Sequence, residues 1–399
     1  MLLGADGAVQ PSIFAEMSAL AAATGALNLG QGFPDEDGPA EVLEAARQAI
    51  SDGVNQYPPG RGMAVLREAI AAHQARWYGI HVDPEREVLV TAGASEALTA
   101  TILALTEPGD EVVVFEPFYD LYGAIVEFAG ARLVTVPLAP VNGRHFEPDL
   151  DALGAAVSER TRLILINSPH NPTGTVLGRE TLELIVALAN RFDAIIVADE
   201  VYEHLTFGVE TAPVEHLPVA SLPGAADRTV TISSGAKTFS TTGWKIGWAI
   251  ARPALIDAIL SVKQFLTYVN GAPFQPAIAV GLGLPDSFFV DAAATLQAKR
   301  DLLITGLTAA GFTTTTPAGG YFVVADAAPL GPAFARAGDA AAFCRELPAL
   351  AGVVAVPMTA FVRPEHRAQY ASLVRFAFCK RVEVLEEAVT RLATLSRVN

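Results

Sequence analysis

A lysine flanked by small residues comes directly after an apolar run in the middle of the chain. Lys237 lies in the string SSGAKTFS, which follows the apolar residues 229–232. A lysine at the end of a buried strand is poorly solvated, and desolvation lowers its pKa, so its amine can attack a carbonyl carbon and form a Schiff base. Ser234 supplies a hydroxyl and Lys245 a second positive charge, which together suit a phosphate group. An isolated lysine here would be a solvated loop charge, but these neighbours favour the chemical role.

An acid and a tyrosine follow a second apolar run, in the string IIVADEVY. Asp199 stands at the end of the predicted strand, where a carboxylate can keep the ring nitrogen of a heterocyclic cofactor protonated. Tyr202, three residues later, can donate a hydrogen bond to an oxygen on the same ring. The alternative is that Asp199 only caps the N-terminus of a helix.

Asn171 lies in the string NSPHNPTG, which follows the apolar run 162–166. Two prolines and a glycine fix a rigid turn, and Pro172 biases Asn171 towards an extended backbone. An amide held in this way can donate to a ring oxygen. Turn chemistry alone would also account for much of the string.

Two further turns between a strand and a helix offer groups for a cofactor. Gly93, Ala94 and Ser95 lie where a helix starts, and the backbone N–H groups there form an anion site, so they are candidates for a phosphate cradle. In the next such turn, Phe118 can stack on a flat heterocycle. The alternative is that this aromatic ring belongs to the core.

One arginine interrupts an apolar run near the end of the chain, in the string LVRFAF. A buried arginine needs an anionic partner, and the planar guanidinium of Arg375 suits a carboxylate bidentately. Glu383 or a surface acid would satisfy it structurally, but the other groups favour a substrate carboxylate.

These groups need strands that end at one edge of a sheet. Between residues 85 and 250, helix-length stretches alternate with short apolar runs at 87–91, 111–115, 132–136, 162–166, 194–198, 229–232 and 246–250. Continuous apolar runs are typical of strands buried on both faces. We therefore predict a mostly parallel, doubly wound α/β sheet with its ligands at the carboxyl ends of the strands.

The remainder of the chain predicts a second, smaller α+β domain. A long helix is expected over 287–310, strands at 320–325, 352–356 and 373–378, and a closing helix over 382–395. We expect residues 1–45 to form an N-terminal segment packed with this small domain, 46–285 to form the large domain, and 286–399 to form the small one. A chain of 399 residues is too long for one core, which agrees with two domains.

Composition restricts the partners and the compartment. The net charge of -16 argues against binding to nucleic acid or to an anionic membrane. Cys344 and Cys379 show neither metal-ligand spacing nor a disulfide framework, so no metal is expected and a reducing cytoplasm is favoured. Residues 1–6 lack the basic segment of a signal peptide, and glycines interrupt the stretch 17–33, which would make a poor membrane helix.

The strings NSPHNPTG, ADEVY and SSGAKTFSTTGWKIGW, in this order and with these spacings, resemble the class I/II aminotransferases of the aspartate-aminotransferase fold. NLGQGFPDEDGP near the start and LVRFAFCK near the end also match, so the resemblance spans almost the whole chain. It implies a pyridoxal-phosphate enzyme of fold type I. Such an enzyme moves an amino group from an amino acid to a 2-oxo acid, with 2-oxoglutarate as the expected acceptor, by a ping-pong mechanism.

For the reacting end of the cofactor, the resemblance implies a role for each of four residues. Lys237 matches the lysine that carries the cofactor as a Schiff base and then acts as general base. Asp199 matches the partner of the pyridinium nitrogen, and Tyr202 and Asn171 match the partners of the phenolic oxygen.

At the phosphate end, Ser234 and Lys245 match phosphate ligands, and the segment from Gly93 to Ser95 matches the helix-start cradle. Many relatives carry arginine where this chain has Lys245, so the charge is kept but the planar fork is lost. Phe118 matches the aromatic residue that stacks on the ring.

On the substrate side, Arg375 matches the arginine for the α-carboxylate, and Gly32 matches the N-terminal loop that closes over the substrate. Tyr57, in the string NQYPPG, matches a tyrosine that reaches the phosphate of a partner subunit, which implies a homodimer with shared active sites. Lys263, Tyr268 and Asn270 are candidates for the entrance, although Tyr268 suits core packing equally well.

Within the family, the strings FAEMSALA, NQYPPG, DEVYEHL and GAPFQPA resemble actinobacterial N-succinyldiaminopimelate aminotransferases, which act in lysine biosynthesis. The chain also resembles the kynurenine/methionine aminotransferase group. Another reaction on the same scaffold, β-elimination of cysteine conjugates, is an alternative because fold does not fix reaction. A cofactor-binding regulator or a non-catalytic structural protein is disfavoured by the complete residue set and by the lack of room for a DNA-binding domain.

Replacing Lys237 with alanine should abolish turnover, since both the Schiff base and the general base are lost, while the protein still folds. Turnover measured beside circular dichroism checks this expectation. Normal activity in the Lys237→Ala variant would contradict the assignment.

Overall fold

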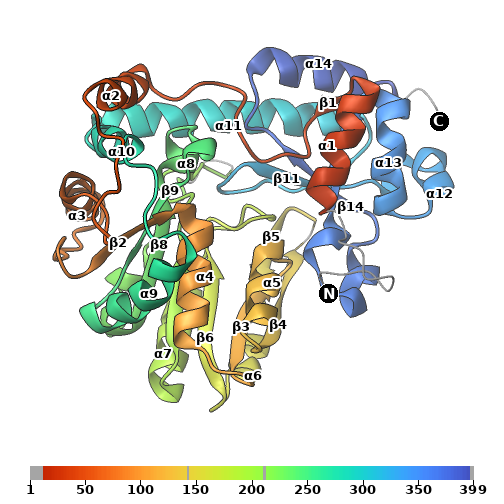
Figure 1. Ribbon diagram of the computed structural model, residues 1–399. Helices are drawn as coiled ribbons and strands as arrows, with labels where there is room; N and C mark the ends of the chain where they lie inside the picture. The colour runs from red at the N-terminus through yellow and green to blue at the C-terminus, as the bar shows by residue number, and fades with distance from the viewer. Residues whose placement is uncertain (1–11, 142, 210–212, 396–399) are drawn as a thin grey trace.

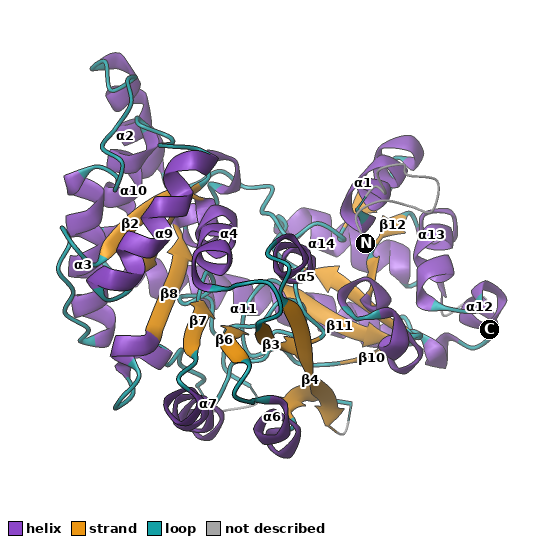
Figure 2. Ribbon diagram, turned by 60° about the horizontal axis from the view of Figure 1, so that its bottom comes forward, coloured by secondary structure: helices purple, strands orange, loops and turns teal. Residues whose placement is uncertain are grey.

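The computed structural model describes residues 12–141, 143–209 and 213–395. The expectation that residues 1–6 lack a signal peptide concerns residues outside these ranges. At the centre lies an eight-stranded sheet with helices on both sides (Figures 1 and 2). Its strands, in spatial order, are β2 (Val88–Ala92), β9 (Ile246–Ile250), β8 (Thr229–Ser234), β7 (Ile195–Asp199), β6 (Thr161–Asn167), β3 (Glu111–Glu116), β4 (Arg132–Val141) and β5 (His145–Pro148).

The sheet is mostly parallel, as predicted. The pairs β3–β4, β3–β6, β6–β7 and β7–β8 are parallel, whereas β9 and β5 run antiparallel to their neighbours. All seven predicted strands of this sheet are present, with ends that differ by a few residues. The short antiparallel strand β5 was not predicted.

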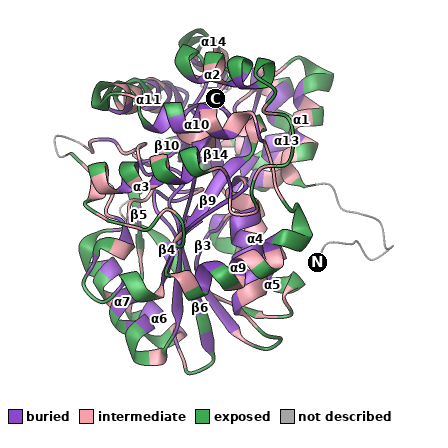
Figure 3. Cartoon of the chain, turned by 60° about the vertical axis from the view of Figure 1, so that its left-hand side comes forward, coloured by how far each residue is buried: buried purple, intermediate pink, exposed green. Residues whose placement is uncertain are grey.

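Alternate residues of the central strands enter two different hydrophobic clusters. On β6, Leu163 and Leu165 pack in one cluster, and Ile164 and Ile166 pack in the other. This two-sided burial explains the continuous apolar runs in the sequence. Figure 3 shows the central strands buried beneath partly exposed helices.

The helices associated with the large sheet connect its strands or flank them. They are α3 (Ala64–Tyr78), α4 (Gly93–Leu105), α5 (Asp120–Phe128), α6 (Leu150–Ala156), α7 (Arg179–Phe192), α8 (Gly235–Thr238), α9 (Pro253–Leu266) and α10 (Phe274–Leu282). Helices α4, α5 and α9 contribute to one cluster, and α6 and α7 to the other.

A smaller antiparallel sheet follows the long helix α11 (Asp286–Ala309). Its strand order is β10 (Thr313–Thr314), β11 (Phe322–Asp326), β14 (Leu373–Ala377) and β13 (Val356–Pro357). Helices α12 (Pro332–Ala337), α13 (Ala340–Ala351) and α14 (Val382–Leu392) complete this part. In Figure 1 it lies above and to the right of the large sheet.

The N-terminal segment joins this C-terminal part across almost the whole length of the sequence. Strand β1 (Leu27–Asn28) pairs in parallel with β12 (Val353–Val354), and α1 (Ile13–Thr24) lies beside α13. The next helix, α2 (Ala40–Ser51), packs on α10 instead. The predicted boundary at residue 45 thus falls within α2, and the one at 285 falls just before α11.

Within the described ranges, no single helix is long and apolar enough to span a membrane. Helices α10 and α11 pass that test only when they are taken together, and they are bent by 90° at the break between them.

Candidate active site

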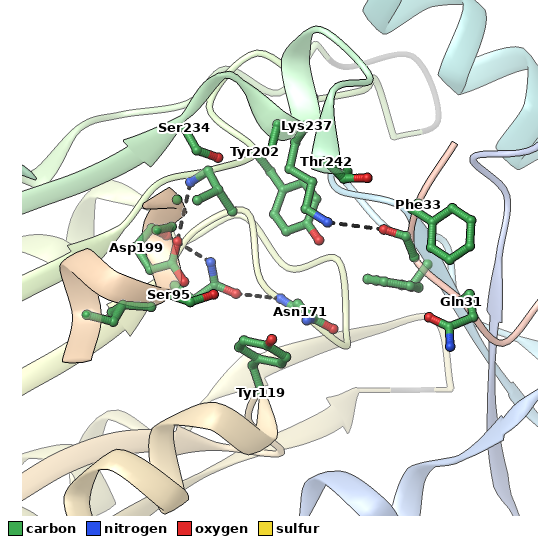
Figure 4. Close-up of a pocket in the computed structure, with 18 of the residues that line it drawn as sticks. Gln31, Phe33, Ser95, Tyr119, Asn171, Asp199, Tyr202, Ser234, Lys237 and Thr242 are labelled. Carbon is green, nitrogen blue, oxygen red and sulfur yellow. Dashed lines mark hydrogen bonds between the residues drawn. The ribbon is translucent and has the colours of Figure 1, made fainter. Parts of the chain in front are cut away.

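A cavity of about 310 Å³ lies at the carboxyl ends of β6, β7 and β8, where the N-terminal segment and the small sheet meet the large sheet. In Figure 4, Asp199 and Ser95 lie at one end, Gln31 and Phe33 at the other, and Lys237 reaches between them. The cavity collects eleven of the residues singled out from the sequence: Gly32, Gly93, Ala94, Ser95, Asn171, Asp199, Tyr202, Ser234, Lys237, Lys245 and Arg375.

Asp199 is the last residue of β7 and is buried at the closed end of the cavity. The Tyr122 hydroxyl donates to its Oδ2 at 2.6 Å, and the backbone N–H of Val201 lies 3.4 Å from its Oδ1. Burial raises the pKa of Asp199 to about 6, and these hydrogen bonds and the nearby Lys237 oppose the rise. A buried carboxylate of this kind gains strongly from a cationic ring N–H.

Lys237 lies in the short helix α8, directly after β8. Its Nζ donates to the carbonyl oxygen of Gly32 at 3.1 Å and lies 5.6 Å from the ring centres of Tyr202 and Tyr321. Desolvation lowers the pKa of Lys237, which favours the neutral amine that a nucleophile or base requires. The main-chain carbonyl of Lys237 accepts a hydrogen bond from Tyr321, which fixes the turn.

The first turn of α4 faces one cation, Lys245, and the hydroxyl of Ser234. No side chain caps the helix start, so the N–H groups of the turn are available to an anion. Lys245 Nζ lies 3.4 Å from Ser95 Oγ, and Ser234 lines the same end of the cavity. A Cβ on Gly247 would lie 2.5 Å from the carbonyl carbon of Gly93, so only glycine lets β9 approach the start of α4 this closely. This arrangement suits a phosphate group.

Arg375, in β14, is buried and makes no ion pair with any residue in the described ranges. Its Nη1 donates to Asn171 Oδ1 and its Nη2 to the carbonyl oxygen of Gly30, both at 2.9 Å, while Nε has no hydrogen-bond partner. The guanidinium lies 3.8 Å from the ring centre of Phe322 and 4.5 Å from that of Phe361. Burial lowers its pKa to about 9, so it stays charged at neutral pH. An entering carboxylate would supply the missing anion.

Asn171 is held by its neighbours in a way that the turn sequence did not show. Its backbone N–H donates to Asn167 Oδ1 at 2.6 Å, and Asn167 Nδ2 donates to the carbonyl oxygen of Asp199 at 2.8 Å. Because the Asn171 Oδ1 accepts from Arg375, its amide nitrogen is the atom left to donate to a ring oxygen.

The expectation for Phe118 was wrong. Its side chain is buried in the hydrophobic cluster beneath α4 and α5, outside the cavity, and a Cβ on Gly123 would meet its ring edge. The next residue, Tyr119, lines the cavity instead (Figure 4). The chain leaves β3 at Glu116 and enters α5 at Asp120, so strand alternation does not set the side-chain direction in between.

Tyr57 lies away from the cavity of its own chain. It is 82 % exposed and packs edge-on against Tyr268, with 5.6 Å between ring centres. Tyr268 is half exposed and therefore not a core residue. Lys263 and Asn270 do not line the cavity either: Lys263 Nζ donates to the Tyr268 carbonyl, and Asn270 Nδ2 donates to the carbonyls of Thr91 and Lys245.

Sequence reasoning missed several residues that line the cavity or hold it in shape. Tyr122 lies in the first turn of α5, three residues after the N-cap residue Tyr119, and the two rings are in contact; this spacing was the available signal. The others carried no signal of their own: Phe14, Gln31, Phe33, Leu98, Asn167, Val201, Ala236, Thr242 and Phe322.

Comparison with known proteins identifies the family. The family model for aminotransferase class I and II matches residues 24–392. This chain is a class I/II aminotransferase. It is 52 % identical to the probable N-succinyldiaminopimelate aminotransferase DapC of Mycobacterium tuberculosis, over 96 % of both chains. The solved structure of the N-succinyldiaminopimelate aminotransferase from that organism covers 96 % of this chain and 97 % of its own, with a TM-score of 0.92.

More distant members of the family act on other amino acids. Human kynurenine–oxoglutarate transaminase 3 is 35 % identical over 94 % of this chain and 86 % of its own. A methionine aminotransferase structure from Escherichia coli is 35 % identical, with a TM-score of 0.88, and covers 96 % of this chain and 97 % of its own.

Class I/II aminotransferases use pyridoxal phosphate, and the residues of this aminotransferase fit that cofactor. The uncapped start of α4, with Lys245 and Ser234, matches the phosphate, and the buried Asp199 matches the pyridinium nitrogen. The amine of Lys237 could react with the aldehyde of the cofactor, and the amide nitrogen of Asn171 could donate a hydrogen bond to the phenolic oxygen.

Replacing Asp199 with asparagine should stabilise the cofactor-free aminotransferase at neutral pH and abolish most of its activity. The pKa of Asp199 is about 6 in the folded protein against an ordinary 3.8, so the folded state holds the proton more tightly. Wild-type stability is therefore lost as pH rises from about 4 to 6, by about 3 kcal/mol in total. Chemical unfolding of both cofactor-free proteins between pH 4 and 7.5 measures this difference.

The gap in stability between Asp199→Asn and wild type should close below about pH 4, where both side chains are neutral. Turnover of the loaded variant should fall at least about 100-fold, because the ring nitrogen loses its ionic partner. A gap that does not change with pH would contradict the ionised-carboxylate assignment.

Replacing Gly32 with alanine should weaken substrate binding more than cofactor binding. A Cβ at this position would overlap the ring of Phe322, which stacks on Arg375. We expect KM for the amino donor to rise about 10-fold, roughly 1.4 kcal/mol, with an unchanged cofactor Kd. The matched control is Gly178→Ala, where a Cβ meets no atom within 4 Å. Equal losses in both variants would contradict this placement of Phe322.

Proposed function

We propose that this aminotransferase takes N-succinyldiaminopimelate as amino donor and 2-oxoglutarate as acceptor, in ping-pong fashion. The likeness to the M. tuberculosis relative, which extends over nearly the full length of both chains, carries the proposal for the donor. The name of the human relative, a kynurenine–oxoglutarate transaminase, supports the acceptor. This donor places the enzyme in lysine biosynthesis.

Bound pyridoxal phosphate supplies an aldehyde that receives the amino group and a protonated ring that withdraws electrons from the substrate Cα. The protein holds this ring at three places. The start of α4 with Lys245 and Ser234 takes the phosphate, Asp199 keeps the ring nitrogen protonated, and the amide of Asn171 donates to the phenolic oxygen. Tyr202 lies beside Lys237 and is the second candidate donor to that oxygen.

Lys237 moves the proton that the reaction requires. With cofactor and substrate bound, the amine of Lys237 would take the proton from the substrate Cα as general base. Desolvation favours the neutral form of this amine, and the nearby Tyr202 and Tyr321 rings restrict its position. In the present structure, the carbonyl oxygen of Gly32 accepts a hydrogen bond from Lys237 Nζ.

Arg375 fixes the donor by its α-carboxylate. The guanidinium is buried between aromatic rings and oriented by Asn171 and Gly30. It is therefore preorganised, and binding a substrate carboxylate requires little further loss of side-chain entropy. The same contact serves the 2-oxo acid in the second half-reaction, since its carboxylate lies next to the reacting carbon as well.

Tyr119, and not Phe118, is the residue that we now propose to stack on the cofactor ring. It lines the cavity and lies 5.7 Å, ring centre to ring centre, from Tyr122, whose hydroxyl binds Asp199. Tyr119, at the N-cap of α5, thus serves the ring face, and Tyr122, in its first turn, serves the acid behind it.

The distal part of a succinylated donor needs further polar groups. Among the described residues that line the cavity, the cations are Lys237, Lys245 and Arg375, and all three have roles at the reacting end. Gln31 lines the other end of the cavity, but its amide Nε2 already donates to the carbonyl oxygen of Phe14 and to the hydroxyl of Ser18. Other contacts would come from a second subunit.

We also propose a homodimer. Tyr57 is exposed beside Tyr268 and does not line the cavity of its own chain, which agrees with a role in the active site of a partner subunit. Sedimentation equilibrium measures the assembly, and a fully active monomer would contradict it. A cytoplasmic location agrees with two free cysteines that are both buried.

Kynurenine or methionine is the second candidate donor, favoured by the 35 % identical relatives. The two candidates differ in one feature: the succinylated donor carries distal carboxylates, whereas kynurenine and methionine carry a single α-carboxylate.

Absorbance of the purified holoenzyme during addition of one donor at a time, without acceptor, tests the proposal. We expect loss of the pyridoxal band and growth of the pyridoxamine band, fastest with N-succinyldiaminopimelate and slower with kynurenine, methionine and glutamate. Higher kcat/KM for kynurenine or methionine would move the enzyme to that group. Pyruvate release from a cysteine conjugate without any acceptor would show β-elimination, and the absence of any cofactor band after adding pyridoxal phosphate would contradict the whole assignment.

A further inference from the structure

A group of imidazoles and a carboxylate lies buried behind the active site, where the mechanism gives it no role. His73 projects from α3, and Glu203 and His204 belong to the turn that follows β7. The two Nε2 atoms of the histidines are 2.8 Å apart, and one ligand atom from each of the three residues lies within 4.8 Å of the others. These residues do not line the active-site cavity.

We propose that His73, Glu203 and His204 bind one divalent transition-metal ion of the zinc class. Zinc with two nitrogen ligands at about 2.0–2.1 Å places those nitrogens roughly 3.3 Å apart in a tetrahedral site. The two imidazoles are already near this separation, so small side-chain rotations would admit the ion. A fourth position is open to water.

The hydrogen bonds of the group leave a lone pair for a cation. Ser233 donates to Glu203 Oε1 at 2.7 Å, but Oε2 is buried and has no hydrogen-bond partner in the described part of the chain. The Tyr78 hydroxyl also lies beside this carboxylate and interacts with it, so a bound ion would share the carboxylate with Tyr78. A buried carboxylate oxygen without a partner is destabilising, and a metal ion would supply that partner.

The two histidines face each other through their ring nitrogens, with Nε2 of His73 and Nε2 of His204 2.8 Å apart. Neutral imidazole is the form that binds metal. Without an ion, the two facing nitrogens can share only one hydrogen.

The surroundings are rigid, and the site is open on one side. The rings of Trp77 and Phe289 lie 4.8 and 4.4 Å from the ring of His204, centre to centre, so His204 has little freedom to turn away. His73 is buried, whereas His204 is partly exposed, which gives an ion access from solvent. The imidazole pair favours zinc over Mg²⁺ or Ca²⁺, which prefer all-oxygen sites.

The proposed ion would act on the active site through the backbone. Glu203 and His204 directly follow Tyr202 in the segment that begins with Asp199. An ion bridging this segment to α3 would hold it against the large domain. Its role is therefore structural.

Zinc titration of the untagged holoenzyme, stripped with a chelator and dialysed, tests the site. We expect calorimetry and metal analysis after desalting to give one zinc per subunit, with a higher Tm when zinc is bound. Mg²⁺ should not bind in the micromolar range. Co²⁺ in place of zinc should give the visible bands of a four-coordinate site with nitrogen and oxygen ligands.

The variants His204→Gln and Glu203→Gln should bind zinc at least about 100-fold more weakly and lose the Tm gain, while the matched control His81→Gln, an exposed histidine, should behave as wild type. Their cofactor absorbance shows that each variant is folded. Wild-type stoichiometry in both site variants, or no wild-type binding below about 100 µM, would overturn the proposal. This readout is independent of the amino donor, so a wrong substrate assignment leaves it intact.

Discussion

The active site depends on keeping a carboxylate and an amine dry at the ends of two neighbouring strands. Asp199 ends β7 and Lys237 follows β8, and the parallel pairing of these strands brings the two turns together. Burial disfavours the charge on both groups. The hydroxyl of Tyr122 and a backbone N–H stabilise the ionised carboxylate of Asp199 without adding a positive charge. Its negative charge is therefore available to a protonated cofactor ring. Covering the sheet with helices on both faces is what excludes water from this edge.

The substrate side of the site also contains a buried charged group without an ionic partner. Arg375 is buried against aromatic rings and receives two orienting contacts, yet no acid in the described ranges pairs with it. Structural ion pairs usually satisfy such a group, so the unpaired cation is itself a mark of function. The affinity for carboxylates arises because folding has already desolvated and ordered the Arg375 guanidinium.

The central strands and the candidate site residues that line the cavity could be predicted because both follow from local patterns. A strand buried on both faces must be continuously apolar, and the groups of a parallel sheet must follow its strand ends, so Lys237, Asp199 and Asn171 could be found by position. Phe118 was predicted in place of Tyr119 because the direction of side chains within a short turn follows no regular period, so the sequence does not show which of two adjacent aromatic residues faces the cavity. Tyr122 and Asn167 were missed because their partners lie 77 and 32 residues away in the chain. The histidine pair was beyond reach for the same reason, since its members lie 131 residues apart.

The pairing of the N-terminal segment has a consequence for biosynthesis. Leu29 forms backbone hydrogen bonds with Val354 and Ala377, and the carbonyl of Gly30 orients Arg375, so this early segment of the chain packs on strands that the ribosome makes last. Residues 88–250, which hold the groups for the cofactor, are complete well before that point. During synthesis, the part of the site that would hold the cofactor can therefore fold first, whereas the part around Arg375 and Gly30 forms only after the C-terminal strands are made. Shortening the chain from either end would remove the same half of the site.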